Sequence, residues 1–186
     1  FIELLLIEKK ELSKMEKVIL VDRQDNETGI MEKQEAHIKG VLHRAFSIFV
    51  FNSKKELLLQ RRAKTKYHSA GLWTNTCCSH PRPKESTKDA ANRRLKEEMG
   101  MSCNLSKQFD FIYKAILTNG LYEHEFDHVY FGTSNDTPTI NLSEVDTYEY
   151  KTLEAIKKEI KNIPERYTEW FKICFVQVEK FYNKNL

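Results

Sequence analysis

The sequence contains only four cysteines, and their positions do not form a disulfide framework. They are Cys77, Cys78, Cys103 and Cys174. Cys77 and Cys78 are adjacent and therefore poorly placed to pair with each other. We expect all four thiols to be reduced, which is typical of a cytoplasmic protein.

Glycine and proline are also scarce, with 6 and 4 residues among 186. The chain has no Pro/Gly-rich linker, internal repeat or low-complexity block, so a second domain is not expected. A length of 186 residues suits a single domain with a sizeable core.

No long hydrophobic run is present. Residues 1–7 are apolar, but Glu3 interrupts them and no basic region precedes them, which argues against a signal peptide or a spanning helix. We expect the domain to begin near Met15, immediately before the strand-like residues 18–21, with residues 1–14 as an extension. The net charge of +3 gives no reason to expect nucleic acid or a membrane as a partner.

Hydrophobic periodicity predicts an α/β (α+β) fold in which helices cover a mixed β-sheet. An amphipathic C-terminal helix should place Tyr167, Trp170, Phe171, Cys174, Phe175, Val178 and Phe181 on one face. The other predicted elements are strands over 45–51, 56–61, 73–81, 109–117 and 123–131, with turns at Asn52-Ser53 and Asn119-Gly120, a basic loop over 64–71 and helices over 86–100 and 153–162.

The helix expected after residue 86 has clear end signals. Ser86 and Asp89 have the spacing of a capping box, and Gly100 stands where a left-handed residue would end the helix.

The run from Trp73 to Pro81 places a thiol and an imidazole two residues apart in a predicted strand. Because strand side chains alternate between faces, Cys78 and His80 should point to one side and Cys77 to the other. One face therefore carries a potential acid/base or nucleophile beside a potential metal ligand.

A second strand carries carboxylates at alternating positions, namely Glu123, Glu125 and Asp127. Carboxylates so close together repel each other unless a cation or basic group lies between them. Two of these carboxylates with His37, His43 and His80 would form a three-histidine, two-carboxylate site for an ion such as Zn²⁺ or Mn²⁺. A solvated strand face is the simpler alternative. Single histidines are more often structural or on the surface, and we assign His68, His124 and His128 to that class.

The helix also resembles the Nudix box, a loop–helix–loop module that binds a divalent cation and a diphosphate. Glu85 is followed by Arg93 and the helix end at Gly100, while Ser79 and Arg94 stand where the box has Gly and Glu. Carboxylates one helical turn apart can hold Mg²⁺ against phosphate, and a basic Arg94 could instead pair with phosphate. The alternative for Arg94 is an ordinary surface ion pair with Glu98.

Taken in order, these motifs resemble the type I isopentenyl-diphosphate isomerases of the Nudix superfamily. The resemblance runs from about Met15 to beyond Trp170 and implies a Nudix-like catalytic domain over residues 15–186. The motifs are Glu32-Lys33 with His37 and His43, Gln60-Arg61-Arg62-Ala63 with Lys66, the run 73–81, the modified Nudix helix and Glu123-His124-Glu125.

The resemblance implies that the chain interconverts isopentenyl and dimethylallyl diphosphate by metal-assisted proton transfer, a 1,3-allylic rearrangement. The first metal, Zn²⁺, Mn²⁺ or Mg²⁺, would be held by His37, His43, His80, Glu123 and Glu125. Cys78 and Glu125 would be the acid/base groups, assisted by Tyr113, and Glu98 with the Cys78 carbonyl would hold Mg²⁺. Lys33, Arg62, Lys66 and Arg94 would contact the diphosphate and Trp170 the hydrocarbon end, although the periodicity of the last helix equally makes Trp170 a core anchor.

Two other functions are compatible with parts of the pattern. A Nudix pyrophosphohydrolase of nucleoside diphosphate derivatives would use the Nudix helix but not Cys78 beside His80. A zinc-stabilised binding module would use the His/Glu cluster but not the thiol and the basic groups. We expect a monomer or weak dimer whose only partner is a small diphosphate.

Overall fold

The computed structural model describes residues 16–117 and 120–184. The predicted domain start at Met15, the extension over residues 1–14 and Asn119 of one predicted turn therefore lie outside the described residues. Gly120, the second residue of that predicted turn, has a φ of 71°, a value that glycine adopts without steric cost.

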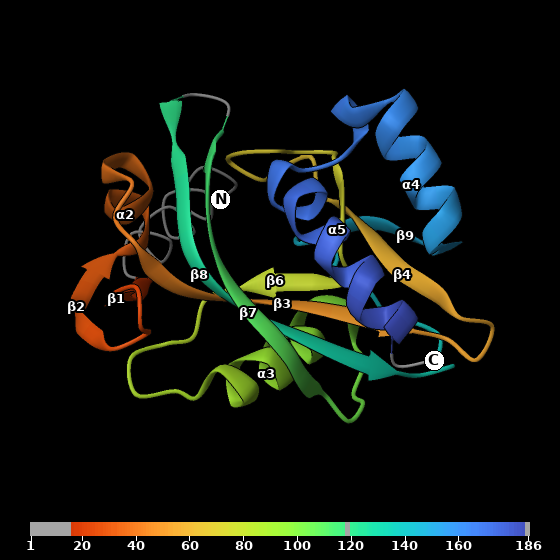
Figure 1. Ribbon diagram of the computed structural model, residues 1–186, viewed down its shortest axis with the longest axis horizontal. Coiled ribbons are helices and arrows are strands. Elements are labelled where there is room, and N and C mark those ends of the chain that lie inside the picture. The colour runs from red at the N-terminus through yellow and green to blue at the C-terminus, as the bar shows by residue number, and fades with distance from the viewer. Residues whose placement is uncertain (1–15, 118–119, 185–186) are drawn as a thin grey trace, which may run out of the picture.

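A mixed sheet of nine strands forms the centre of the described chain (Figure 1). The strands are β1 (Lys17–Val21), β2 (Glu27–Glu32), β3 (His43–Phe51), β4 (Glu56–Arg62), β5 (Trp73–Thr74), β6 (Cys77–Ser79), β7 (Ser106–Ile116), β8 (Tyr122–Thr133) and β9 (Val145–Thr152). The helices are α2 (Lys33–Lys39), α3 (Thr87–Met99), α4 (Leu153–Asn162), the short 3₁₀ helix η2 (Pro164–Arg166) and α5 (Glu169–Lys184). The predicted α+β class is confirmed.

Strand β3 is the hub of this sheet. It pairs antiparallel with β1, β4 and β6 and parallel with β8, which forms a long antiparallel hairpin with β7. Its alternating side chains serve two separate cores. Ile48 packs with α3 residues such as Leu95, while Phe49 faces Phe171 of α5. Figure 1 shows α3 and α5 on the two sides of this strand.

The end signals of α3 were predicted correctly. The Ser86 hydroxyl accepts a hydrogen bond from the Asp89 backbone N–H at 3.1 Å, and Gly100 ends the helix with a φ of 65°. Its buried stripe includes Ala90, Leu95 and Met99. The helix predicted over 153–162 also matches α4.

The single strand predicted over 73–81 is two short strands, because polar side chains interrupt it. The Thr76 hydroxyl donates to the Leu58 carbonyl at 2.7 Å and accepts from the Val50 N–H at 2.9 Å. The Asn75 amide donates to the Cys77 carbonyl at 2.7 Å. These side chains replace ladder hydrogen bonds of the backbone between β5 and β6.

Four elements were not predicted: β2, α2, β9 and the short helix η2. Helix α2 has Glu32 as its N-cap, whose carboxylate accepts from the Gln34 and Glu35 backbone N–H groups. Glutamate is not a usual start signal, so the helix that carries His37 was missed. Strand β9 pairs with β4 over seven residue positions. In its sequence the polar residues Thr147, Glu149 and Lys151 alternate with two tyrosines, a pattern that indicates a strand.

Helix α5 covers the face of the sheet opposite α3. Trp170, Phe171 and Phe175 are nearly fully buried, and burial of such a side chain stabilises the fold by about 1.5–3 kcal/mol. Tyr167, predicted on this helix face, lies just before the helix and forms a bridge with Trp73, but its side chain is also buried.

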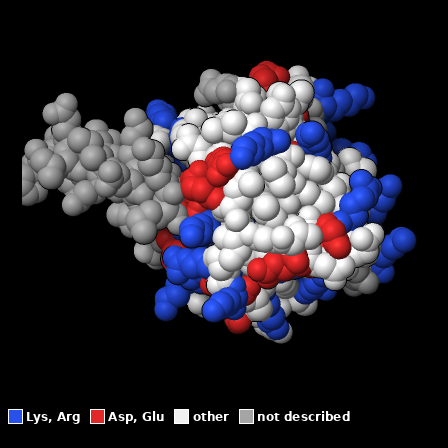
Figure 2. Space-filling view, turned by 90° about the vertical axis from the view of Figure 1, so that its left-hand side faces the viewer, with Lys and Arg blue, Asp and Glu red and all other residues white. Residues whose placement is uncertain are grey.

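In Figure 2 basic and acidic side chains both lie around a broad area without charged side chains on the face shown. Among the described residues, no helix has the length and hydropathy needed to cross a membrane.

Candidate active site with a histidine–glutamate cluster

Four buried side chains converge between the N-terminal part of the sheet and α2. His37 comes from α2, His43 begins β3, His80 follows β6, and Glu125 lies on β8 directly opposite His43. Their potential ligand atoms all lie within 4.8 Å of one another. Segments far apart in the sequence thus build one compact cluster.

Backbone carbonyls orient two of the imidazoles. His37 Nδ1 lies 2.7 Å from the Lys33 carbonyl, and His43 Nδ1 lies 2.8 Å from the Val41 carbonyl. A carbonyl only accepts, so each Nδ1 carries the hydrogen and each Nε2 has a free lone pair. His43 Nε2 is 3.2 Å from His80 Nε2, which is itself 3.0 Å from Glu125 Oε1. Inward-facing nitrogens beside a carboxylate oxygen suit a divalent cation.

Burial also keeps the His37 and His80 rings neutral. Burial, together with His80 and His43, lowers the pKa of His37 to about 3. The pKa of His80 is lowered mainly by burial, although Glu125 opposes the shift. Neutral imidazoles are the form that binds a metal, so the cluster fits the group that the sequence predicted.

Glu123 lies beside this cluster rather than within the four-residue set. It shares a hydroxyl with Glu125, since Tyr113 Oη is 2.6 Å from Glu125 Oε2 and 3.1 Å from Glu123 Oε2. Burial and the charge of Glu125 raise the pKa of Glu123 well above its usual range. Burial and the charges of Glu123 and Glu125 likewise raise the pKa of Tyr113. Tyr113 therefore keeps its proton and connects the two carboxyl groups.

The alternation predicted for the two adjacent cysteines is confirmed. Cys77 is fully buried in the core against α3, whereas Cys78 packs against the opposite core, below α5. Burial raises the pKa of the Cys78 thiol well above its usual range; Arg62 opposes the shift, and nearby carboxylates, including Glu98, reinforce it. Cys78 is thus a protonated thiol on the face that carries Glu125.

The four basic residues predicted to bind a diphosphate come from separate elements. Lys33 begins α2, Arg62 ends β4, Lys66 lies in the following loop and Arg94 lies on α3. Lys33 interacts electrostatically with Arg94 and with Glu144. Glu144 also forms an ion pair with Lys66. These positive charges form one neighbourhood.

Most of these cations already have carboxylate partners. Lys33 pairs with Glu16 at 2.9 Å, Lys66 with Glu144, and Arg94 with Glu98 at 2.6 Å and Glu144 at 3.4 Å. The Arg94–Glu98 pair considered from the sequence is therefore present, but it is largely buried rather than on the surface. Glu16 and Glu144 were missed because their partners are distant in sequence.

Glu98 is tied to the sheet as well as to Arg94. The Gln60 amide donates to Glu98 Oε2 at 2.8 Å and to the Thr76 carbonyl at 2.9 Å. Gln60 thereby links the Nudix helix to the segment that leads into Cys78. Sequence patterns gave no signal for this link.

Trp170 reaches the site from α5 and is also a core residue. Its ring lies 5.1 Å from the Arg62 guanidinium carbon and 5.9 Å from the His68 ring. It is 4% exposed, so the interpretation of Trp170 as a core anchor is confirmed, while its contact with the hydrocarbon end of a substrate stays a prediction.

The three histidines assigned to structural or surface positions behave differently from one another. His124 contacts the Gly40 carbonyl at 3.0 Å, and His128 pairs with Asp25 at 3.0 Å, both outside the cluster. His68, in contrast, is buried with its ring 6.3 Å from that of His37. The only sequence feature that marked the position of His68 was the basic loop over 64–71.

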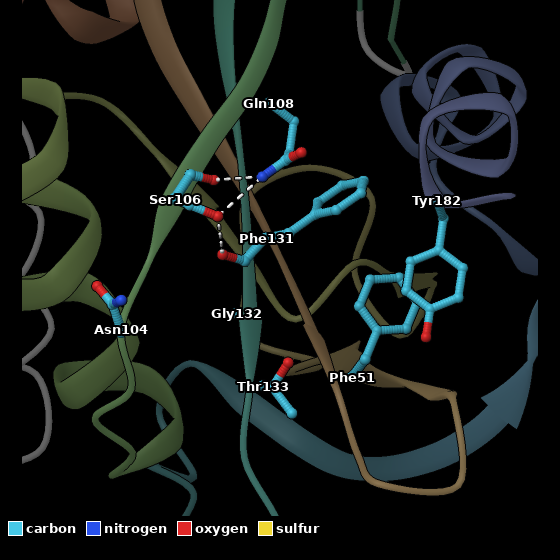
Figure 3. A pocket seen from close by; sticks show the side chains of 8 residues that line it. All are labelled: Phe51, Asn104, Ser106, Gln108, Phe131, Gly132, Thr133 and Tyr182. Atoms are coloured by element: carbon cyan, nitrogen blue, oxygen red, sulfur yellow. Dashed lines mark hydrogen bonds between the residues drawn. The ribbon is translucent and has the colours of Figure 1, made fainter. Parts of the chain in front are cut away.

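A separate surface cavity of about 360 Å³ lies beside the end of α5 (Figure 3). Gln108 donates there to the Ser106 hydroxyl at 2.8 Å, and the aromatic ring of Tyr182 forms one wall. The remaining lining residues are Phe51, Asn104, Phe131, Gly132 and Thr133. None of the predicted site residues lines this cavity.

Comparison with solved structures supports the fold. A crystal structure of a protein from Deinococcus radiodurans superposes with a TM-score of 0.72 over 90% of this chain and 99% of that chain, at 18% identity. A MutT protein from Methanosarcina mazei gives a TM-score of 0.62 over 77% of this chain and 95% of that chain, at 21% identity. At these identities the likeness establishes the fold alone.

Sequence relatives are much more similar. The isopentenyl-diphosphate Delta-isomerase of Pectobacterium atrosepticum is 53% identical over 165 residues, covering 89% of this chain and 92% of the relative. The isopentenyl-diphosphate Delta-isomerase 2 of Photorhabdus laumondii is 56% identical over 155 residues, covering 83% and 88%. The NUDIX domain family matches residues 41–171. The chain therefore belongs to the NUDIX domain family and, within it, to the isopentenyl-diphosphate Delta-isomerases.

Proposed function

We propose that this chain is an isopentenyl-diphosphate Delta-isomerase that interconverts isopentenyl and dimethylallyl diphosphate. The observation that carries the proposal is a protonated thiol, Cys78, on the same face as a Tyr113–Glu125 pair that borders a His₃Glu cluster. Relatives about 50% identical over most of the chain carry this name.

The reaction moves a double bond by two proton transfers. One proton is added to the terminal methylene carbon, and another is removed from the allylic carbon. We assign these transfers to Cys78 on one side of the substrate and to Glu125, assisted by Tyr113, on the other. Because the reaction is reversible, each group donates in one direction and accepts in the other.

The cationic state between the two transfers must be protected from water. Helix α5 covers this face of the sheet, and Trp170 is its aromatic residue nearest to the basic groups. A ring facing the developing tertiary cation would contribute about 0.5–2 kcal/mol. We assign Trp170 to the hydrocarbon end of the substrate.

The histidine cluster is suited to hold Zn²⁺, Mn²⁺ or Mg²⁺ through His37, His43, His80 and Glu125, and we assign Glu123 as the fifth ligand. Such an ion, when bound, supplies positive charge that makes the Glu125 carboxyl a stronger acid. We assign a second ion, Mg²⁺, to Glu98 and the Cys78 carbonyl, where it would neutralise the substrate diphosphate. Lys33, Arg62, Lys66 and Arg94 are its proposed cationic contacts.

We also propose a catalytic domain over residues 15–186 that acts in the cytoplasm as a monomer or weak dimer. The free thiols of all four cysteines support a reducing compartment. Sedimentation of the purified protein would determine its oligomeric state.

The activity is tested by incubating the metal-loaded protein with isopentenyl diphosphate and Mg²⁺ in D₂O. Proton NMR should show deuterium incorporation and formation of dimethylallyl diphosphate. Absence of exchange in protein of full metal content would refute the isomerase assignment. Release of phosphate products from a nucleoside diphosphate derivative would instead support a pyrophosphohydrolase, which the basic Arg94 in the Nudix helix argues against.

A further inference from the structure

His68 occupies the junction between the two halves of the proposed site. It lies in the basic loop after β4 and is only 8% exposed. Its ring centroid is 6.3 Å from that of His37, in the metal cluster, and 5.9 Å from that of Trp170, which its ring meets nearly edge-on. The imidazole therefore stands between the cluster and the residue assigned to the hydrocarbon end.

Neighbouring groups hold His68 in this position. The Arg62 guanidinium donates to the His68 carbonyl at 3.2 Å while its own carbon lies over Trp170. The Tyr67 ring packs against the imidazole at 4.4 Å in a T-shaped arrangement. With its backbone carbonyl held by Arg62 and its ring packed against Tyr67, the imidazole is preorganised to meet a ligand without a large further loss of freedom.

The imidazole has unused hydrogen-bonding capacity. Nδ1 lies 3.3 Å from the Ser69 hydroxyl, whereas Nε2 has no hydrogen-bond partner among the residues that the structure describes. Burial, with Arg62, His37 and Lys33, lowers the pKa of His68 to about 2, so the ring stays neutral. In the tautomer that accepts a hydrogen bond from the Ser69 hydroxyl at Nδ1, the ring hydrogen is on Nε2.

We propose that His68 is a further substrate-contacting residue, which donates a hydrogen bond from Nε2 to the diphosphate end of the substrate and closes the wall between the histidine cluster and Trp170. The inference rests on the proposed function for the identity of the substrate. Its anionic ligand is favoured by the adjacent cations Arg62 and Lys33, both of which act electrostatically on this ring. A neutral N–H adds a directed contact to these charges without adding repulsion among them.

The test compares H68Q, which keeps an N–H donor, with H68F, which keeps a flat ring but has no donor. Both are prepared with a full metal complement, and binding of inorganic diphosphate with Mg²⁺ is measured by calorimetry. We expect H68F to bind diphosphate about tenfold more weakly, as loss of one hydrogen bond to a charged group implies, and H68Q to stay within about threefold of the unmodified protein. H128Q is the matched control, because His128 pairs with Asp25 away from the cluster.

Turnover separates this contact from a structural role. H68F should raise the KM for isopentenyl diphosphate by about tenfold with little change in kcat or metal content. Diphosphate binding by H68F equal to that of the unmodified protein would overturn the inference, as would equal losses in H68Q and H68F accompanied by loss of metal. If the unmodified protein binds diphosphate but does not isomerise the substrate, the proposed function fails while the diphosphate contact of His68 is still decided by the binding data.

Discussion

At the scale of single residues, the two adjacent cysteines show how backbone geometry separates chemically identical groups. Cys77 and Cys78 differ only in the face of β6 to which they point. Cys77 packs against α3 in a buried core, and Cys78 lies near the carboxylates of β8. Cys78 is therefore the thiol that we propose for proton transfer to the substrate.

We predict that Cys78→Ala lowers turnover by at least about 10³-fold, because a positioned acid/base group commonly contributes about 10²–10⁴-fold. Cys77→Ala should keep turnover within a few-fold and lower the free energy of unfolding by about 1 kcal/mol through lost packing. The deuterium-exchange assay and chemical denaturation measure the two effects. The reverse pattern would contradict the assignment of faces.

Sequence periodicity predicted such facing relationships well, because they follow from the two-residue repeat of a strand. Glu123 and Glu125 were placed on one face for the same reason, and the structure confirms it. The same patterns could not place His68 or Glu144. Their partners come from other parts of the chain, and a local repeat carries no information on which segments meet.

At the scale of elements, α3 depends on its C-terminal glycine. Gly100 has a φ of 65°, and a Cβ added there would lie 2.5 Å from the Thr139 carbonyl oxygen. Gly120 has a similar φ of 71° but open space around it. The two positions share the backbone requirement and differ in steric clearance.

Gly100→Ala should therefore destabilise the protein by more than about 2 kcal/mol, since the left-handed conformation costs about 1–2 kcal/mol and the clash adds to it. Gly120→Ala should lower the free energy of unfolding only by the cost of the left-handed conformation. Thermal unfolding of the two variants provides the measurement. Equal losses of stability would show that the contact with Thr139 is readily relieved.

Element prediction succeeded where local signals were present. The Ser86 cap and Gly100 stop defined α3 to the residue, whereas the glutamate cap of α2 gave no signal. The break between β5 and β6 depends on Asn75 and Thr76 bonding to strands that are neighbours only in the folded chain. Local patterns do not show which partners of this kind meet, and the histidine cluster was expected from its residue types and from the family resemblance rather than from local periodicity.

At the scale of the whole molecule, two neutral buried histidines couple stability to pH. The pKa values of His37 and His68 are lowered from 6.5 to about 3 and about 2. The unfolded chain takes up protons at these rings below pH 6.5, while the folded chain does not. Their stabilising effect is therefore complete above pH 6.5 and is lost progressively as the pH falls.

For the metal-free protein we predict that the free energy of unfolding decreases between pH 6 and 4, by up to about 1.4 kcal/mol per pH unit for each histidine. The H68Q variant should show a slope smaller by one such contribution. Urea unfolding across this pH range tests it. Parallel curves for the two proteins would mean that His68 titrates alike in both states.

Metal removal should also affect the entire fold. An ion at a free concentration of 100 times its Kd adds about 2.7 kcal/mol to stability, which corresponds to a Tm shift of about 5–10 °C for a protein of this size. Dialysis against a chelator should lower the Tm by this amount, and added Zn²⁺ or Mn²⁺ should restore it. His80→Ala should abolish the metal-dependent shift. An unchanged Tm after verified metal removal would argue against a tight site.

The parallel pairing of β3 with β8 has a consequence for how this protein folds while it is being synthesised. Residues such as Ser47 and Asp127, which bond across it, stand 80 positions apart in the chain. Parallel partners need a long crossover and meet late, because closing a large loop precedes the contacts that reward it. A chain still being synthesised therefore contains the histidines of the cluster but lacks Glu125 until β8 has been made and has docked against β3. We therefore expect the complete ligand set, and with it the tightest metal binding, to arise only once β8 has docked against β3.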